Sequence, residues 1–190
     1  LGCKAFGAGL NEVEASEPVY LDEAGGIGLF GVGYQRACRK ADENKAGCYS
    51  WSDLDAIQST INQIKAKCRW CIVVAHAGEE FTPLPSPYTR ERYHKYLEMG
   101  ADIVVSHHPH VPMNYETVGD KIIFYSLGNF ISAQNRGPRM LGGRLNFEIV
   151  KNNTTGSVAI ENVTFSGVVT HYGHGFSNIR VYPLEDYTQE

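Results

Sequence analysis

Two short apolar segments with one helix between them constrain the fold of this chain more than any other feature. Residues 71–75 and 102–105 are predominantly apolar and have the length of single strands. Between them, a segment from about residue 89 to residue 99 predicts a helix that stops at Gly100, a residue type typical of helix ends. A strand, a crossing helix and a second strand form a parallel pair, and unbroken apolar strands indicate a sheet covered on both faces.

The segments around this unit predict two further strands and one capped helix. Residues 27–32 and 121–125 have the pattern of strands, and residues 35–50 have the polar composition of a surface loop. Ser52 is the predicted N-cap of the next helix, and Asp55, three residues later, completes a capping box.

The C-terminal part of the chain follows a different pattern. From about Leu145 onward apolar and polar residues alternate, which predicts antiparallel strands. A length of 190 residues is most simply one domain. We therefore predict an α/β sandwich with a partly antiparallel sheet, in which residues 1–144 form the α/β portion and residues 145–190 form a β-rich tail.

Charge and hydropathy exclude two classes of function. The formal net charge is −4 and the chain has no run of basic residues, so nucleic-acid binding has no electrostatic support. No apolar run approaches the roughly 18 residues that are needed to span a bilayer.

The first residues contain neither an initiating Met nor a signal pattern, so we expect the chain to be a fragment or a processed product.

The five cysteines leave the redox state open. Their number is odd, so at least one of them has no partner within the chain. Cys38 and Cys48 flank a polar loop and fit a disulfide in an oxidising compartment, but they fit isolated thiols equally well. Cys68 and Cys71 have CxxC spacing without a second such pair, so a zinc ribbon is not predicted.

The run His107-His108-Pro109-His110 carries the strongest chemical signal. It holds three of the seven histidines and follows a predicted strand. Proline stiffens the run, and a residue that precedes proline favours extended backbone, which is the geometry expected for His108. A rigid loop of imidazoles is suited to a metal ion such as Zn, Mn, Fe or Ni, while the alternative interpretation is a solvated loop.

Topology brings further polar residues to the same place. The strands 71–75, 102–105 and 121–125 are each followed by polar, ligand-capable residues, at positions 76–80, 106–110 and 126–129. In open α/β sheets ligands bind outside the carboxyl ends of the strands. We therefore expect His76, His108 and His110 to converge, with Glu79 close to them.

At these residues the sequence resembles the CapA family, the poly-γ-glutamate capsule biosynthesis proteins, within the calcineurin-like metallophosphoesterase superfamily. The resemblance covers about residues 5–150. It rests on four ordered segments: Gly7 to Ala15, Ile72 to Glu79, Gly100 to Val111, and Tyr125 to Phe130.

The resemblance implies a calcineurin-like metallophosphoesterase sandwich, with mixed sheets flanked by helices, and roles for individual residues. His76 resembles the isolated metal-ligand histidine of the superfamily, and His108 and His110 resemble its closing His-x-His pair. His107 stands where the wider superfamily has glycine, and we interpret it as a proton donor to the leaving group. Asn129 is expected to line the catalytic site, and Glu79 to join the metal ligands.

One departure from the superfamily pattern concerns the first metal ligands. They come from an N-terminal half that contains an early Asp, a Gly-Asp motif and an Asn-His motif, none of which occurs here before residue 70. A two-metal site needs ligands from both halves. The resemblance therefore implies that the N-terminal half is missing or is a separate chain, or that the site is degenerate.

Two functions follow from the resemblance. The first is a metal-dependent hydrolase that uses Mn, Zn or Fe ions to attack a phosphoester or a glutamyl polymer. The second is a non-catalytic accessory protein that binds an anionic capsule polymer, with positive charge from metals or from arginines at positions 90, 92, 136 and 139. Both imply an extracellular or cell-surface location, and we expect a partner segment or a dimer contact at the exposed edge of the sheet.

Overall fold

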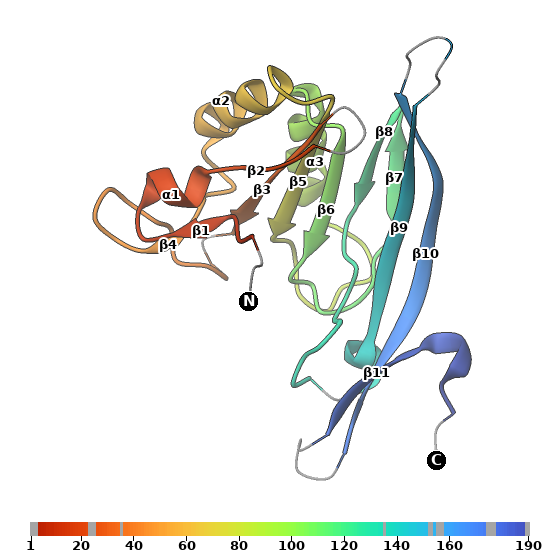
Figure 1. Cartoon of the computed structure of the whole chain (residues 1–190). Helices are drawn as coiled ribbons and strands as arrows, with labels where there is room; N and C mark the ends of the chain where they lie inside the picture. Colours follow the sequence, from red (N-terminus) through yellow and green to blue (C-terminus); the bar gives the residue numbers. More distant parts are fainter. Residues whose placement is uncertain are drawn as a thin grey trace.

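The centre of the protein is a six-stranded mixed sheet. The computed structural model describes residues 4–22, 26–34, 36–134, 136–151, 154, 158–173 and 178–188. The strand order is β2-β3-β5-β6-β8-β7 (Figure 1). Four inner strands run parallel, and an antiparallel strand lies at each edge. Their bounds are β2 (Val19–Leu21), β3 (Ile27–Gly33), β5 (Trp70–His76), β6 (Ile103–His107), β8 (Lys121–Phe124) and β7 (Tyr115–Val118).

Two helices cover one face of this sheet. Helix α2 (Leu54–Lys65) and helix α3 (Pro87–Glu98) pack their buried faces on Val73 and Val104 of the central strands. The predicted cap of α2 is wrong by one residue, because Asp53 and not Ser52 accepts the hydrogen bond, from the amide of Ala56. Gly100, at φ +114°, ends the second helix as predicted.

The β-rich tail covers part of the opposite face. Strands β9 (Leu141–Lys151), β10 (Val158–Tyr172) and β11 (Ile179–Pro183) form an antiparallel sheet, as the alternation predicted. Leu145 and Phe147 of β9 pack against a cluster on the main sheet that contains Ile72, Ile103, Ile122 and Phe124. The first tail strand begins at Leu141 and not at Leu145, because Gly142 and Gly143 already pair with β10.

The segment between β3 and α2 is largely exposed, as its polar composition predicted, but it also contains a short strand and buried residues. Its strand β4 (Gly47–Cys48) pairs with β1 (Ala8–Gly9), next to the short helix α1 (Glu12–Ser16). Ala41 and Tyr49 are buried there in the core on the helix side of the sheet. Two 3-10 turns, Gly137–Met140 and Leu184–Asp186, flank the tail strands. Within the described residues, no helix has the length and apolarity needed to cross a membrane.

Candidate metal centre

The C-terminal ends of the parallel strands bring the predicted site residues to one edge of the sheet, the lower edge in Figure 1. His76 at the end of β5 pairs in register with His107 at the end of β6. The two loops that follow then contact each other: the amide of Ala77 donates to the carbonyl of His107 at 3.0 Å, and the amide of Phe81 donates to that of Pro109 at 2.9 Å. The parallel pairing predicted from the crossing helix is confirmed.

Four side chains gather between these loops. The ligand atoms of Glu80, His108 and His110 lie within 4.8 Å of one another. The Nε2 atom of His108 is 3.8 Å from Oε1 of Glu80. The ring of His76 lies with its centroid 5.0 Å from that of His108, and the rings of His108 and His110 are 5.9 Å apart. The structure thus brings together the three histidines, and the carboxylate beside them belongs to Glu80.

The carboxylate of Glu79 is hydrogen-bonded to the start of helix α3. Its carboxylate accepts hydrogen bonds from the amide and hydroxyl of Ser86, the helix N-cap, and from the hydroxyl of Thr89. Burial acts to raise the pKa of Glu79, but the hydrogen bonds from Ser86 and Thr89 outweigh it, so the pKa lies below its usual value. The carboxylate is therefore engaged in holding the loop against the helix, in a position where the helix dipole favours a negative charge.

Backbone conformations rare for side-chain-bearing residues concentrate at the cluster. Phe81, His108 and His110 have φ values of +61°, +101° and +63°. The extended geometry expected for His108 from the following proline is therefore wrong. Each such residue costs about 1–3 kcal/mol of strain, which persists only where surrounding contacts enforce it. One such contact comes from Gly78, at φ +113°, where an added Cβ would lie 3.3 Å from the ring of Pro109.

Asn129 sets the orientation of His110. Its side-chain amide donates to the backbone carbonyl of Arg139 at 2.9 Å, which turns its Oδ1 toward Nδ1 of His110, also at 2.9 Å. An amide oxygen accepts only, so Nδ1 of His110 must carry the proton, and the lone pair of Nε2 is left available to a cation. A hydrogen bond of this kind is the usual support of a metal-binding imidazole. Asn129 thus acts on the cluster through His110.

The imidazoles of His76 and His108 favour their neutral form. Burial lowers the pKa of His76, and the nearby His108, His107 and His110 lower it further. Burial also lowers the pKa of His108, although Glu80 opposes that effect. A neutral imidazole presents a lone pair to a metal ion, so these environments suit metal binding at neutral pH.

His107 lies on the same face of the sheet as His76. Among the residues that the structure describes, its side chain makes no ring contact and no hydrogen bond. Burial lowers its pKa, so the side chain is neutral near pH 7. A neutral imidazole accepts a proton more readily than it donates one. Beneath it, the buried hydroxyl of Ser106 contacts that of Tyr93 at 2.6 Å and supports the loop from the helix side.

The four arginines considered at the sequence level separate in space. Arg90 pairs with Glu116 of β7, and the guanidinium of Arg92 lies over the rings of Trp51 and Tyr88, so both are engaged by residues outside the cluster. Arg136 is exposed. Arg139 alone is connected to the cluster: its guanidinium lies 4.8 Å from the ring centroid of Phe81, and that ring stacks on His110 at 5.7 Å. Arg139 makes no ion pair with the residues that the structure describes.

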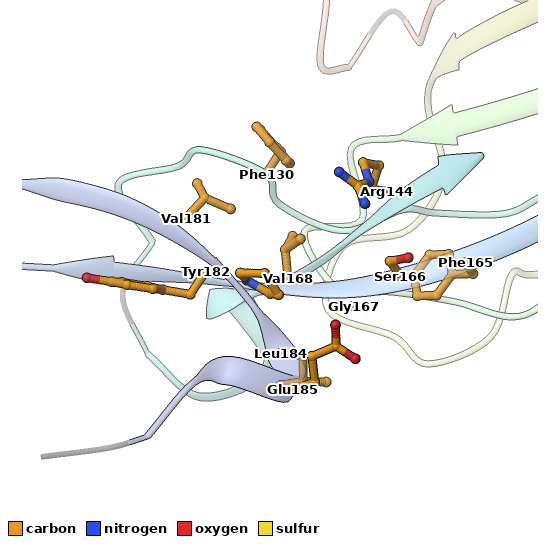
Figure 2. Close-up of a pocket in the computed structure, with 11 residues that line it drawn as sticks. Phe130, Arg144, Phe165, Ser166, Gly167, Val168, Val181, Tyr182, Leu184 and Glu185 are labelled. Atoms are coloured by element: carbon orange, nitrogen blue, oxygen red, sulfur yellow. The ribbon is translucent and has the colours of Figure 1, made fainter.

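A separate groove of about 580 Å³ lies on the tail sheet. Figure 2 shows Phe130 and Arg144 on one side of it, Leu184 and Glu185 on the other, and Val168 between them. The groove contains no histidine of the cluster, but it adjoins the cluster through Phe130, the residue after Asn129. Sequence reasoning missed it, because its residues come from three strands, a loop and a 3-10 turn and form no local motif.

Comparison with known protein families assigns most of the chain. Residues 1–134 match the family described as bacterial capsule synthesis protein PGA_cap, which is more than half of the chain. The chain belongs to the PGA_cap family. The matched residues of this PGA_cap protein include the whole histidine cluster and Asn129, whereas Arg139 and the tail sheet lie beyond them.

Two curated relatives of this PGA_cap protein come from bacilli. It is 28% identical over 151 residues to the PGA biosynthesis protein CapA of Bacillus subtilis, a match that covers 78% of this chain and 40% of the relative. It is 32% identical over 134 residues to the capsule biosynthesis protein CapA of Bacillus anthracis, a match that covers 67% of this chain and 32% of that relative. The chain thus spans less than half the length of these relatives.

A solved structure supports the fold assignment. The crystal structure of a proposed 5′-nucleotidase from Staphylococcus aureus, in complex with alpha-ketoglutarate, matches with a TM-score of 0.54. The match covers 84% of this PGA_cap chain and 31% of that chain, at 16% identity. At this identity the likeness concerns the fold alone, and it confirms the predicted phosphoesterase-like α/β architecture.

Proposed function

We propose that this PGA_cap protein is a metal-dependent hydrolase of anionic substrates that acts in the synthesis or export of a poly-γ-glutamate capsule. The observation that carries the proposal is the convergence of His76, His108, His110 and Glu80 at the carboxyl edge of a parallel sheet. Family membership supports the capsule context, and the two CapA relatives carry that context in their names.

The donor set fits a divalent ion. Two ligands of one ion lie about 3–4 Å apart, given bond lengths near 2.1 Å. The atoms of Glu80, His108 and His110 lie within 4.8 Å of one another, so small side-chain rotations would close them on one ion. Imidazole nitrogen with one carboxylate favours Zn, Mn or Fe over Ca or Mg. When bound, such an ion acidifies a water molecule and stabilises negative charge that develops on the substrate.

The residues around the donors have their own tasks in this proposal. Asn129 holds the tautomer of His110, and Phe81 stacks on the same ring. Arg139, which lies over Phe81 without an acidic partner among the described residues, can bind a phosphate or carboxylate group of the substrate through its guanidinium. His107, neutral and next to His76 in register, is the candidate for proton transfer.

The substrate class and the partners follow the same reasoning. A phosphoester through its phosphate, and a glutamyl polymer through the carboxylates beside its amides, would both present anionic oxygens to Arg139. The superfamily pattern implies a two-metal centre, and we propose that a separate segment or a dimer partner supplies the remaining ligands. A capsule polymer is assembled at the cell surface, so we propose that the protein acts there.

A second candidate function is binding of the anionic polymer without turnover. The groove on the tail sheet favours it, because Arg144 stands there beside the half-exposed ring of Phe130. A polymer seated in this groove would reach Arg139 and the cluster along the loop that connects them. Metal with turnover favours the hydrolase, and polymer binding without turnover favours the accessory protein.

The deciding experiment measures metal content and hydrolysis together. The purified protein is reconstituted with Mn or Zn, its metal is counted by elemental mass spectrometry, and phosphoester and γ-glutamyl substrates are assayed. We expect near-stoichiometric metal that is lost in the His108→Ala/His110→Ala double variant. Asn129→Ala should weaken metal binding about 10–100-fold through loss of the support to His110, and Asn62→Ala, at an exposed position on helix α2, should not. Absence of metal after reconstitution would exclude the hydrolase for this chain.

A further inference from the structure

The segment between β3 and α2 brings two cysteine thiols together beside a glycine. Cys38 lies in the turn after β3, and Cys48 ends strand β4. A Cβ atom placed on Gly33 would lie 2.7 Å from Sγ of Cys48 and 2.9 Å from Sγ of Cys38. The two sulfurs therefore occupy the space that a side chain at position 33 would fill, and glycine at that position allows them to meet.

Backbone pairing holds the two cysteines in this arrangement. The amide of Cys48 donates to the carbonyl of Arg39 at 2.7 Å, and the amide of Ala41 donates to the carbonyl of Cys48 at 2.9 Å. The residues that follow Cys38 are thus bonded across to Cys48 itself. Both cysteines are partly exposed, in contrast to Cys68 and Cys71, which are buried in the core. The pair is accessible to a small reagent and is set in place by the fold.

We propose that Cys38 and Cys48 are a redox-active pair that closes to a disulfide when the protein meets a small-molecule disulfide. One thiolate attacks a sulfur of the reagent, which forms a mixed disulfide and releases one reagent thiol. The second cysteine then attacks the protein sulfur of that mixed disulfide and releases the other reagent thiol. Two electrons pass to the reagent, and the two protons of the cysteines end on the released thiols.

The environment of Cys48 gives the order of the two steps. Burial, the negative charge that Cys38 acquires and a hydrogen bond with Cys38 together raise the pKa of Cys48 to about 11. Cys48 is therefore a slow nucleophile toward reagent in solution. We expect it to react second, when the mixed disulfide on Cys38 already lies beside it.

The bond would fix the segment next to the metal cluster. Gly33 is the register partner of His76, and the amide of Tyr34 donates to the carbonyl of His76 at 3.0 Å. Closing a short loop in this segment restricts the unfolded chain and is expected to raise the melting temperature by about 5–10 °C. Disulfides persist in oxidising compartments, so a stable bond here agrees with the proposed cell-surface location.

The test incubates the native protein with oxidised glutathione and follows intact mass, peptide connectivity and melting temperature. We expect a mass lower by two hydrogen atoms, and a tryptic cross-link between peptides 37–39 and 46–65, which contain Cys38 and Cys48. The melting temperature should rise on oxidation and fall back with a reductant. Cys38→Ser and Cys48→Ser should each match the reduced protein in stability and show no such change.

Two further readouts keep the proposal open to refutation. Cys68 and Cys71 are the internal control: burial raises the pKa of Cys71 to about 12, so alkylation after oxidation should find this pair still reduced. Gly33→Ala should slow closure, because its methyl group would crowd both sulfurs. Free thiols at 38 and 48 after oxidation, or cross-links distributed among all the cysteines, would overturn the pairing whether or not the protein binds a metal.

Discussion

At the scale of single residues, the histidine loop combines unfavourable backbone conformations with well-placed side chains. His108 adopts φ +101°, a region that favours glycine, while its ring lies between those of His76 and His110. The strained backbone lowers the stability of the protein, so replacing the functional side chain at such a position by glycine is expected to relieve the strain and stabilise the fold.

We predict that His108→Gly is more stable than His108→Ala by about 1 kcal/mol in urea unfolding of the metal-free protein, since only glycine relieves the strain. Both variants should lose metal binding. His171, an exposed residue of β10 without positive φ, is the matched control, and there the alanine variant should be at least as stable as the glycine variant. Equal stabilities of the two His108 variants would show that the position carries no strain.

The residue scale also shows what spacing can and cannot predict. His76, His108 and His110 were identified because imidazoles after neighbouring parallel strands must share an edge. Glu79 and Glu80 are adjacent in the sequence, so composition cannot distinguish which of them faces the histidines. That choice is made by Ser86 and Thr89, whose hydroxyls hold Glu79 at the start of α3 and leave Glu80 beside the cluster.

At the scale of elements, helix α3 is fastened to the edge of the sheet through one carboxylate. Glu116 of β7 accepts from Arg90 and contacts His94, both on α3, and also accepts from the hydroxyl of Tyr125 at 2.7 Å. The hydrogen bond from Arg90 is the main cause that lowers the pKa of Glu116 to about 2. The loop that carries Glu80 leads directly into α3. The contacts of Glu116 with this helix therefore help to fix the C-terminal end of that loop.

The lowered pKa predicts how stability depends on pH. A carboxyl group with a folded pKa near 2 and an unfolded pKa near 4.5 stabilises the fold fully above pH 4.5, and this contribution is lost as pH falls toward 2. We predict that Glu116→Gln lowers the free energy of unfolding at pH 7 by about 1 kcal/mol, the upper end of the range for solvent-exposed ion pairs, because Glu116 also accepts from Tyr125. The free energy of unfolding of the variant should also lack the decrease between pH 4.5 and pH 2 that Glu116 causes in the native protein. Glu98→Gln, in an exposed pair with Lys95, is the control and should change neither quantity measurably.

Sequence reasoning identified elements in proportion to their apolar content. The buried strands β5 and β6 were found because both faces are covered and their residues are apolar up to the polar C-terminal ends. Strand β7 was missed because it is a short edge strand with two polar residues among four, and β4 because it has only two residues. Ser52 and Asp53 are both good caps, and only the helix geometry selects Asp53.

At the scale of the whole molecule, the tail sheet and the main sheet share one apolar layer. Leu145 and Phe147 of β9 pack on the face of the main sheet opposite the helices, over Ile72 and Ile103. The same face of the main sheet carries His76 and His107 at its carboxyl edge. The tail sheet therefore covers the apolar layer next to the histidine cluster. Alternation in the sequence predicted the tail strands, but not the surface that they cover.

This shared layer predicts that the two sheets unfold together. Phe147→Ala removes a partly buried ring from the layer and should lower the free energy of unfolding by about 2 kcal/mol. Trp51 and Trp70 are both buried in the α/β portion, so their fluorescence reports on the main sheet, whereas far-UV circular dichroism reports on both sheets. We expect both signals of the variant to shift to the same lower urea concentration. Phe165→Ala, whose ring is half-exposed on β10, should shift them less. A fluorescence transition that stays in place while an earlier transition develops in the circular dichroism would instead show that the tail sheet unfolds independently.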